Sequence, residues 1–206
     1  MTLGPTIILK IPLSDTLVKM STTGSGNTFG ARYWTDGKQE APMLPDRPWL
    51  RRHPKTGELF WTDECKKIAE ESPWEGKDNY RKVPYAESPS LEDYRQAMVS
   101  GIASTPEKQR YVLMRYWWAA NDPVRRGDTS VPSPYDLDER LLQFLALLDT
   151  KNPNQRLMAA EVARQLRDFT KAVQLLKFRF PKNCSHAVKL IKKLASEENS
   201  TVHQLA

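Results

Sequence analysis

The segments IILKIPLSDTLVKM at residues 7–20 and LRRHPKTGELFW at residues 50–61 share one pattern. Each begins and ends with aliphatic, β-branched or aromatic residues, which favour pleated strands, and each carries a proline near its centre. In the second segment, Gly57 supplies the positive φ that a tight turn often needs. Both segments therefore predict two antiparallel strands joined by a tight turn, and together they predict a small β-ribbon.

Both turns align without a gap on the Cys-Pro-x-Cys knuckle of zinc-binding proteins. Ile11-Pro12-Leu13-Ser14 occupies one knuckle and His53-Pro54-Lys55-Thr56 occupies the other. The pair resembles a zinc ribbon, in which two such knuckles supply four ligands to one tetrahedral zinc ion. The resemblance makes Ile11, Ser14, His53 and Thr56 the vestigial ligand positions, and His53 is the one good zinc ligand of the four. It implies a ribbon fold that has lost its metal, so we expect neither a metal nor another cofactor.

A metal-free ribbon needs another source of folding free energy, because structural zinc normally supplies much of it. We expect Ile11 to fill the vacated site and aromatic side chains to bury large areas, the candidates being Trp34, Trp49, Phe60 and Trp61.

Asp63 suits the N-cap of a helix over residues 64–71. Cys65 in that run and the distant Cys184 are expected to be lone structural thiols.

From Ser88 onward, apolar residues recur with helical spacing. Ser90 and Asp93 form a near capping box, and Pro106 suits the first turn of a second helix that ends before Pro123. A third helix is apolar nearly all round, which predicts that it is buried. The expected helices span about 90–102, 105–122, 136–149, the hairpin 155–178 and 184–198.

The segment QRLMAAEVARQLRDFTKAVQLLKF at residues 155–178 resembles one tetratricopeptide repeat. Ala160 takes the position where that repeat needs a small residue, and Phe169 and Ala172 follow at offsets of 9 and 12. Arg167 replaces the usual glycine of the inter-helix turn, and Arg156 replaces the usual tryptophan of the first helix. The resemblance implies a helical scaffold with a protein-binding role, in which neighbouring helices complete the stack.

These two parts predict an α+β protein. A small β-ribbon domain at residues 1–86 is followed by an α-helical hairpin, tetratricopeptide-like domain at residues 88–206. This layout, with its SGNTFGARYWTDGK insert at residues 25–38, is similar to uncharacterised bacterial proteins, and the likeness implies a bacterial, cytoplasmic protein. Two cysteines in 206 residues exclude a disulfide framework, and no apolar run reaches the roughly 18 residues that a membrane span needs.

The function favoured by the sequence is non-enzymatic protein binding, as an adaptor, regulator or inhibitor that uses the helical hairpins. The residues expected to contact an unidentified protein partner are Arg115, Trp117, Trp118, Arg125 and Arg126. Trp117 and Trp118 are adjacent in a helix, so their rings cannot share a face. The competing interpretation of these two side chains is helix-helix core.

The alternative function is nucleic-acid binding through a basic stripe near the C-terminus. The chain carries 31 basic and 25 acidic residues, a net charge of +6. The excess is concentrated in six residues with no acidic residue among them: Lys177, Arg179, Lys182, Lys189, Lys192 and Lys193. Such a stripe is the electrostatic pattern of phosphate-backbone binding, although a solvated helix face has the same composition.

The sequence contains no catalytic signature, and we expect no enzymatic activity. One small polar and aromatic cluster suits chemistry, namely Asp36 and Lys38 near Arg32 and Trp34. An enzyme built on this cluster predicts that Asp36→Ala abolishes a turnover and leaves folding intact. The competing interpretation is a charged hairpin tip.

Overall fold

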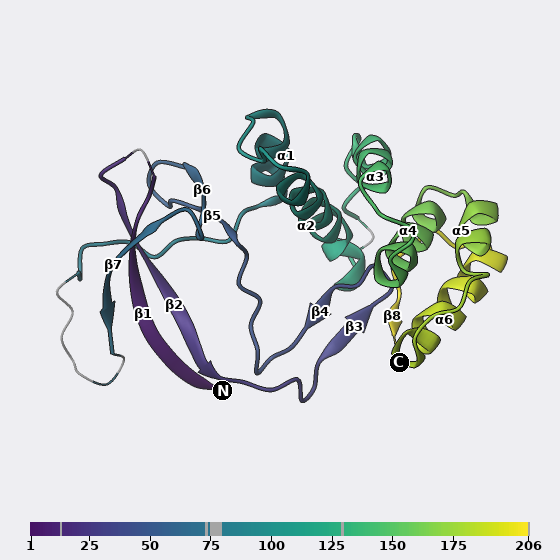
Figure 1. Ribbon diagram of the computed structural model, residues 1–206, viewed down its shortest axis with the longest axis horizontal. Coiled ribbons are helices and arrows are strands. Elements are labelled where there is room, and N and C mark those ends of the chain that lie inside the picture. Colours follow the sequence, from purple (N-terminus) through teal and green to yellow (C-terminus); the bar gives the residue numbers. More distant parts are fainter. Residues whose placement is uncertain (13, 73, 75–79, 129, 206) are drawn as a thin grey trace. The chain divides into compact units, whose positions relative to one another are not determined.

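The computed structural model describes residues 1–12, 14–72, 74, 80–128 and 130–205. The protein is α+β: small antiparallel sheets come first and helices follow (Figure 1). Two compact units make up the chain. The first contains Met1–Ala31 and Glu40–Ile102, and the second contains Arg32–Gln39 and Ala103–Ala206.

Both strand-turn-strand segments form in the first unit. β1 (Thr2–Lys10) pairs antiparallel with β2 (Leu17–Ser25), and β5 (Leu50–Arg52) pairs antiparallel with β6 (Leu59–Trp61). Gly57 has a φ of +75°, as the second turn requires. The two predicted hairpins are therefore confirmed; Leu13, in the first turn, lies outside the described residues.

An extended segment at residues 84–87 joins the two hairpins. The N–H of Lys19 donates to the Pro84 carbonyl at 2.8 Å, and the N–H of Ala86 donates back to Lys19 at 2.9 Å. On the other side, Glu87 and Arg52 exchange backbone hydrogen bonds of 2.9 and 3.1 Å. Side chains from both hairpins share one core beneath this connection: Leu9, Ile11, Val18, Phe60 and Ala86.

The expected helix over residues 64–71 is wrong. Residues Lys66–Glu71 form strand β7, which pairs antiparallel with β1 in a sheet of order β2-β1-β7. Pairing with β1 satisfies the backbone groups of this segment and overrides the helical propensity of its residues. Its charged side chains suit an edge strand, where they oppose edge-to-edge association.

Helix α1 (Leu91–Val99) belongs to the first unit, so the units differ from the expected division between residues 86 and 88. Its N-terminus carries the full capping box of Ser90 and Asp93. Arg52 on β5 reaches Glu87 at 2.8 Å and Asp93 at 3.4 Å. These contacts attach the helix to the hairpins of the first unit.

The second unit is mainly helical, and its helices run from teal to yellow in Figure 1. They are α2 (Pro106–Arg125), α3 (Leu137–Ala146), α4 (Pro153–Gln165), α5 (Phe169–Leu175), the 3₁₀ turn η1 (Lys182–Cys184) and α6 (Ser185–Ser196). A small sheet of order β4-β3-β8 contains β3 (Arg32–Trp34), β4 (Gln39–Glu40) and β8 (Gln204–Leu205). The turn predicted near residues 166–169 falls between α4 and α5.

Two helix predictions in this unit are corrected. α2 continues past Pro123, because Arg125 stabilises the last turn by donating to the Trp118 carbonyl at 2.7 Å and to Asp122 at 2.6 Å. α3 is buried along one face only, since Leu141 and Phe144 are buried whereas Leu142 is 58% exposed.

Candidate nucleic-acid interface

The four positions expected to be vestigial zinc ligands have other roles in the structure. Ile11 is buried in the shared core of the hairpins. His53 is buried and its Nδ1 accepts the Thr56 N–H at 3.1 Å, while the Ser14 hydroxyl accepts the Thr16 N–H at 3.3 Å. The polar members therefore close their own turns, and within the described residues no group of three or more His, Cys, Asp or Glu side chains is suited to a metal ion.

The aromatic residues expected to replace the metal divide between the units. Phe60 and Trp61 are buried in the first unit, where Trp61 Nε1 donates to the Ile102 carbonyl at 2.9 Å. Trp34 lies in the second unit, on β3, and Trp49 is 64% exposed.

Burial, aided by the nearby Glu64 carboxylate, raises the pKa of the Cys65 thiol to about 11. This thiol stays protonated near neutral pH and is a poor metal ligand or nucleophile there.

Asp36 is the centre of a buried network in the second unit. Its carboxylate accepts hydrogen bonds from Arg125 Nη2, from Asn121 Nδ2 at 2.9 Å and from the Lys38 N–H at 3.1 Å. The Lys38 ammonium pairs with Asp122. The Asp36 side chain is fully buried and held on several sides, as a structural anion is. The charged hairpin tip expected from the sequence is thus an interior ion cluster.

The five residues expected to contact a protein partner do not share one surface. Trp117 is fully buried, donates to Gln165 at 2.8 Å and packs on Phe144. Arg125 is also buried, with its guanidinium over the Trp34 ring. Trp118 is half-buried beneath Arg115, and Arg126 is exposed. Trp117 and Arg125 are core residues of the unit because they pack against residues of α3, α4 and β3, which lie far away in the sequence.

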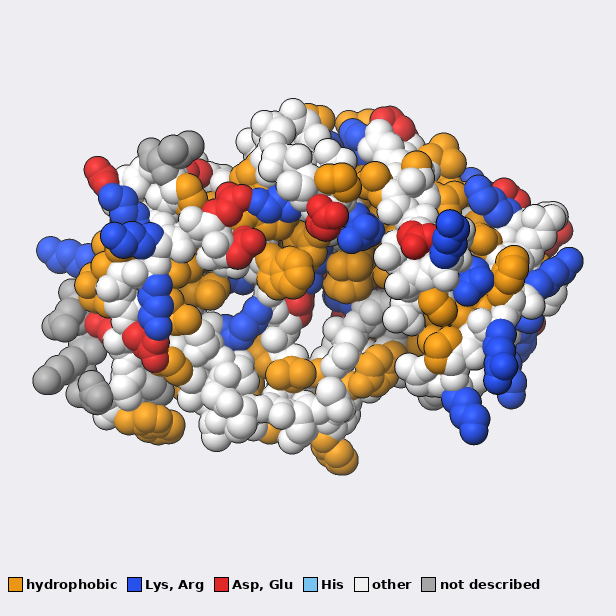
Figure 2. Space-filling model, in the orientation of Figure 1, with side chains coloured by type: hydrophobic (Ala, Val, Ile, Leu, Met, Phe, Trp, Pro, Cys, Tyr) orange, Lys and Arg blue, Asp and Glu red, His pale blue; other side chains and the backbone are white. Residues whose placement is uncertain are grey.

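The basic stripe is wholly exposed: Lys177, Arg179, Lys182, Lys189, Lys192 and Lys193 all reach solvent from the segment that holds the end of α5, η1 and α6. We call these six residues the basic face. On α6, Ile191, Leu194 and Ala195 turn inward, so the lysines of this amphipathic helix point outward. Figure 2 shows Lys and Arg side chains gathered over α5 and α6.

The charges of the basic face are almost uncompensated. No acidic residue occurs between Phe169 and Ser196. Among the described residues, one member of the face has an ion-pair partner: Lys193, which lies 3.8 Å from Glu197 at the end of the helix. Both of these side chains are mostly exposed, so the pair is weak and screened by salt. The six cations therefore present their positive charge to solvent with little compensation.

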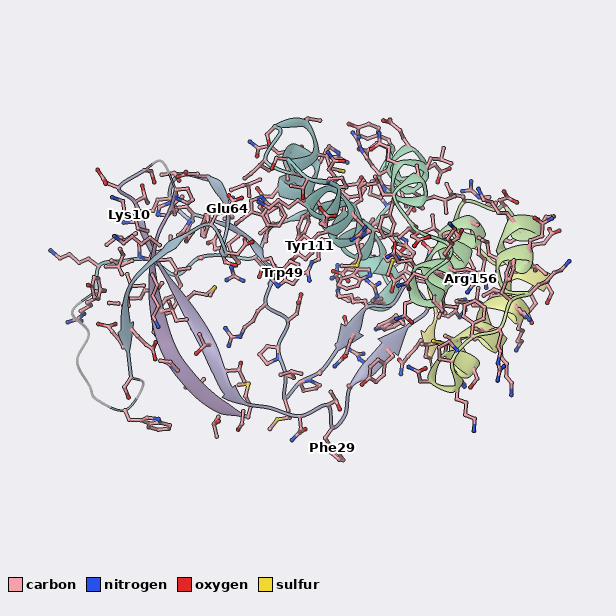
Figure 3. All side chains as sticks on the ribbon, in the orientation of Figure 1. Lys10, Phe29, Trp49, Glu64, Tyr111 and Arg156 are labelled. Atoms are coloured by element: carbon pink, nitrogen blue, oxygen red, sulfur yellow. The ribbon has the colours of Figure 1, made fainter. Side chains whose placement is uncertain are left out.

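An aromatic group lies within this face. Phe178 is 60% exposed, and the guanidinium carbon of Arg156 is 4.8 Å from its ring centroid. The same guanidinium lies 5.2 Å from the ring of Phe180. Arg156 comes from α4 and is labelled in Figure 3.

Sequence reasoning missed Arg156 and Phe178 as members of the site. The alternation of basic and aromatic residues in Lys177-Phe178-Arg179-Phe180 was the available signal for the phenylalanine. For Arg156, which lies 22 residues before Phe178, no local pattern indicates the contact.

Comparisons of the chain with family models, with curated proteins and with solved structures found no match. Over the part of the chain that the structure describes, no helix is long and apolar enough to cross a membrane.

Proposed function

We propose that this protein binds nucleic acid through the basic face of its helical unit. The observation that carries the proposal is the exposure of all six cations on one acid-free segment, Lys177 to Lys193. Each cation that contacts a phosphate releases condensed counterions, and this release drives association. The proposed binding depends on the phosphate backbone and on salt, and it does not require base-specific contacts.

Burial favours this function over the protein-binding alternative. A protein interface usually depends on a few well-packed aromatic and arginine side chains at its centre. Two of the five residues expected in that role, Trp117 and Arg125, are enclosed within the unit. All six residues expected to bind nucleic acid are exposed.

The test is fluorescence anisotropy of the full chain with a labelled oligonucleotide of about 20 nucleotides, titrated at salt concentrations from about 50 to 200 mM. The logarithm of the association constant should fall linearly with the logarithm of salt concentration. In the triple variant Lys189→Gln/Lys192→Gln/Lys193→Gln, the slope should become shallower by about 0.7 for each substituted lysine that binds a phosphate of the single strand.

A matched control removes the same amount of charge elsewhere. Lys55, Lys66 and Lys151 are exposed and lie outside the basic face, so their triple glutamine variant keeps the same net charge as the test variant. This control should keep the wild-type slope. Equal slopes for both triple variants, or absence of salt-dependent binding by the wild type, would overturn the proposal. The protein-binding alternative would be favoured by a different result: a complex with a protein whose affinity changes little with salt but falls when Arg115 or Trp118 is substituted.

A further inference from the structure

Phe178 is an exposed aromatic side chain that the fold supports from one side. Its ring has the guanidinium of Arg156 against one part of its surface, yet 60% of the residue remains in contact with solvent. The same guanidinium faces the ring of Phe180, which is partly buried and packs against the cluster of Ala160, Leu176 and Ile191. The arginine that supports the exposed ring is therefore itself held against the core of the unit.

Arg156 has an unusual environment for a partly buried arginine. Its Nε is buried and has no hydrogen-bond partner among the described residues. The side chain is placed by two aromatic rings, at 4.8 and 5.2 Å, rather than by a carboxylate. A cation is attracted to the face of an aromatic ring, so this stack positions the Phe178 ring. A pre-positioned ring loses little conformational freedom when a ligand stacks on it.

The surroundings of Phe178 indicate what kind of ligand stacks there. Lys177 and Arg179 flank it directly in the sequence, and Lys182 follows at the start of η1. All three are exposed cations. An aromatic platform among phosphate-binding cations is the arrangement by which proteins hold single-stranded nucleic acid, because every base has a π-face.

We propose that Phe178 is a base-stacking subsite and that the protein therefore prefers single strands with unpaired bases. This inference rests on the proposed nucleic-acid binding and adds the class of strand to it. In a duplex each base is already stacked on its neighbours and offers no free face, so Phe178 gains nothing there. The basic face alone would bind duplex and single strand through their phosphates.

The experiment compares three ligands of the full chain in anisotropy or competition format: an oligothymidylate of about 20 nucleotides, a duplex of the same length, and heparin as a polyanion without bases. Phe178→Leu keeps an apolar side chain on Arg156 but removes the π-face. It should weaken binding to the oligothymidylate by about 5- to 100-fold. Its affinity for the duplex and heparin, and its salt dependence, should stay at the wild-type values.

Two further variants keep the result interpretable. Phe178→Trp should retain or increase affinity for the single strand. The fluorescence of its added indole, measured as the difference from wild type, should be quenched on binding. Phe29→Leu removes another exposed phenylalanine, 85% exposed in the first unit, and should change nothing. Thermal unfolding of each variant checks that the helical unit remains folded.

The outcomes separate the two proposals. Wild-type protein that binds none of the three ligands overturns both. Salt-dependent binding of all three, with Phe178→Leu as tight as wild type on the oligothymidylate, overturns the stacking subsite and keeps the basic face. A selective loss on the single strand, with rescue by Phe178→Trp, supports both.

Discussion

The helical unit holds two sets of cations in opposite environments. Arg125 and Arg164 are buried: Arg164 donates to Glu161 at 2.5 and 2.8 Å and also to the carbonyls of Asn199 and Thr201. The basic face is exposed, and only Lys193 among its members has an ion-pair partner in the described part of the chain. The same formal charge therefore occurs in two opposite environments within one unit.

This difference predicts that the buried cations determine stability and that the exposed cations are responsible for the proposed binding. A buried cation is tolerated only with a full set of partners, and removing one partner leaves a charge stranded in a medium of low polarity. An exposed cation contributes little to folding but remains available to a ligand. Substitutions of the buried arginines should consequently lower the free energy of unfolding. Substitutions in the basic face should instead weaken the proposed binding of nucleic acid.

The largest effect is expected for Arg164→Met. This change leaves the fully buried Glu161 carboxylate without its cation and two backbone carbonyls without a donor. We expect the free energy of unfolding to fall by about 3–5 kcal/mol, measured by urea denaturation. The matched control is the triple variant Lys189→Gln/Lys192→Gln/Lys193→Gln, whose stability should stay within about 0.5 kcal/mol of wild type. Comparable losses in the two proteins would contradict the division between buried and exposed cations.

The next largest effect is expected for Asp36→Ala. Arg125 would keep Asp122 but lose its second carboxylate, and the Asn121 amide would lose an acceptor. We expect a loss of about 2–4 kcal/mol in urea denaturation. Asp46→Ala, at an exposed aspartate, serves as the control and should change stability by less than about 0.5 kcal/mol. An Asp36→Ala protein as stable as wild type would contradict this structural role. It would match the behaviour that the enzyme interpretation predicts for Asp36.

Local patterns were sufficient to predict the hairpins and most helices. The turn around Gly57 and the capping box of Ser90 and Asp93 depend on residues only a few positions apart, and both occur as expected. β7 was mispredicted because its pairing with β1 joins segments about 60 residues apart. Non-local pairing of this kind overrides local propensity and leaves no signal in one sequence.

The candidate site shows the same limit. The basic face was predicted because the absence of acidic residues is visible in the sequence. The burial of Arg125 was not predicted, because its partner Asp36 is 89 residues away in the sequence. A run of charges can therefore indicate a surface, but only the fold shows which single arginines are interior ion pairs.

A smaller effect of opposite sign is expected at Arg167. This residue follows α4 with a φ of +65°, and the next N–H, of Asp168, bonds back to the Ala163 carbonyl at 2.8 Å. Such a helix C-terminus favours glycine, since other residues are strained there. We expect Arg167→Gly to stabilise the unit by about 1 kcal/mol in urea denaturation.

Arg167→Ala separates backbone strain from charge. Both variants remove the exposed ion pair with Asp138, which is 3.5 Å long and contributes little. Alanine keeps the strain, so its stability should match wild type. If alanine and glycine gave the same change, the charge of Arg167 rather than its backbone would be responsible.

The smallest effect concerns His203, beside the buried Arg164. Burial, together with the Arg164 cation, lowers the pKa of the His203 ring below its ordinary value of 6.5, although Glu161 and Glu197 oppose the shift. The unfolded chain therefore binds more protons than the folded chain just below pH 6.5, and stability rises with pH through that range. The contribution of the neutral ring is complete above pH 6.5 and is lost on acidification towards the folded pKa.

Urea denaturation of wild type and His203→Gln at about pH 7.5 and pH 5.5 tests this contribution. Glutamine retains groups able to bond Asn199 and Thr201, the partners of the ring nitrogen at 3.1 Å, but it does not titrate. Wild type should lose more stability on acidification than the variant. An equal loss would mean that the ring gains its proton without penalty, so that the low polarity around Arg164 does not extend to the neighbouring side chain.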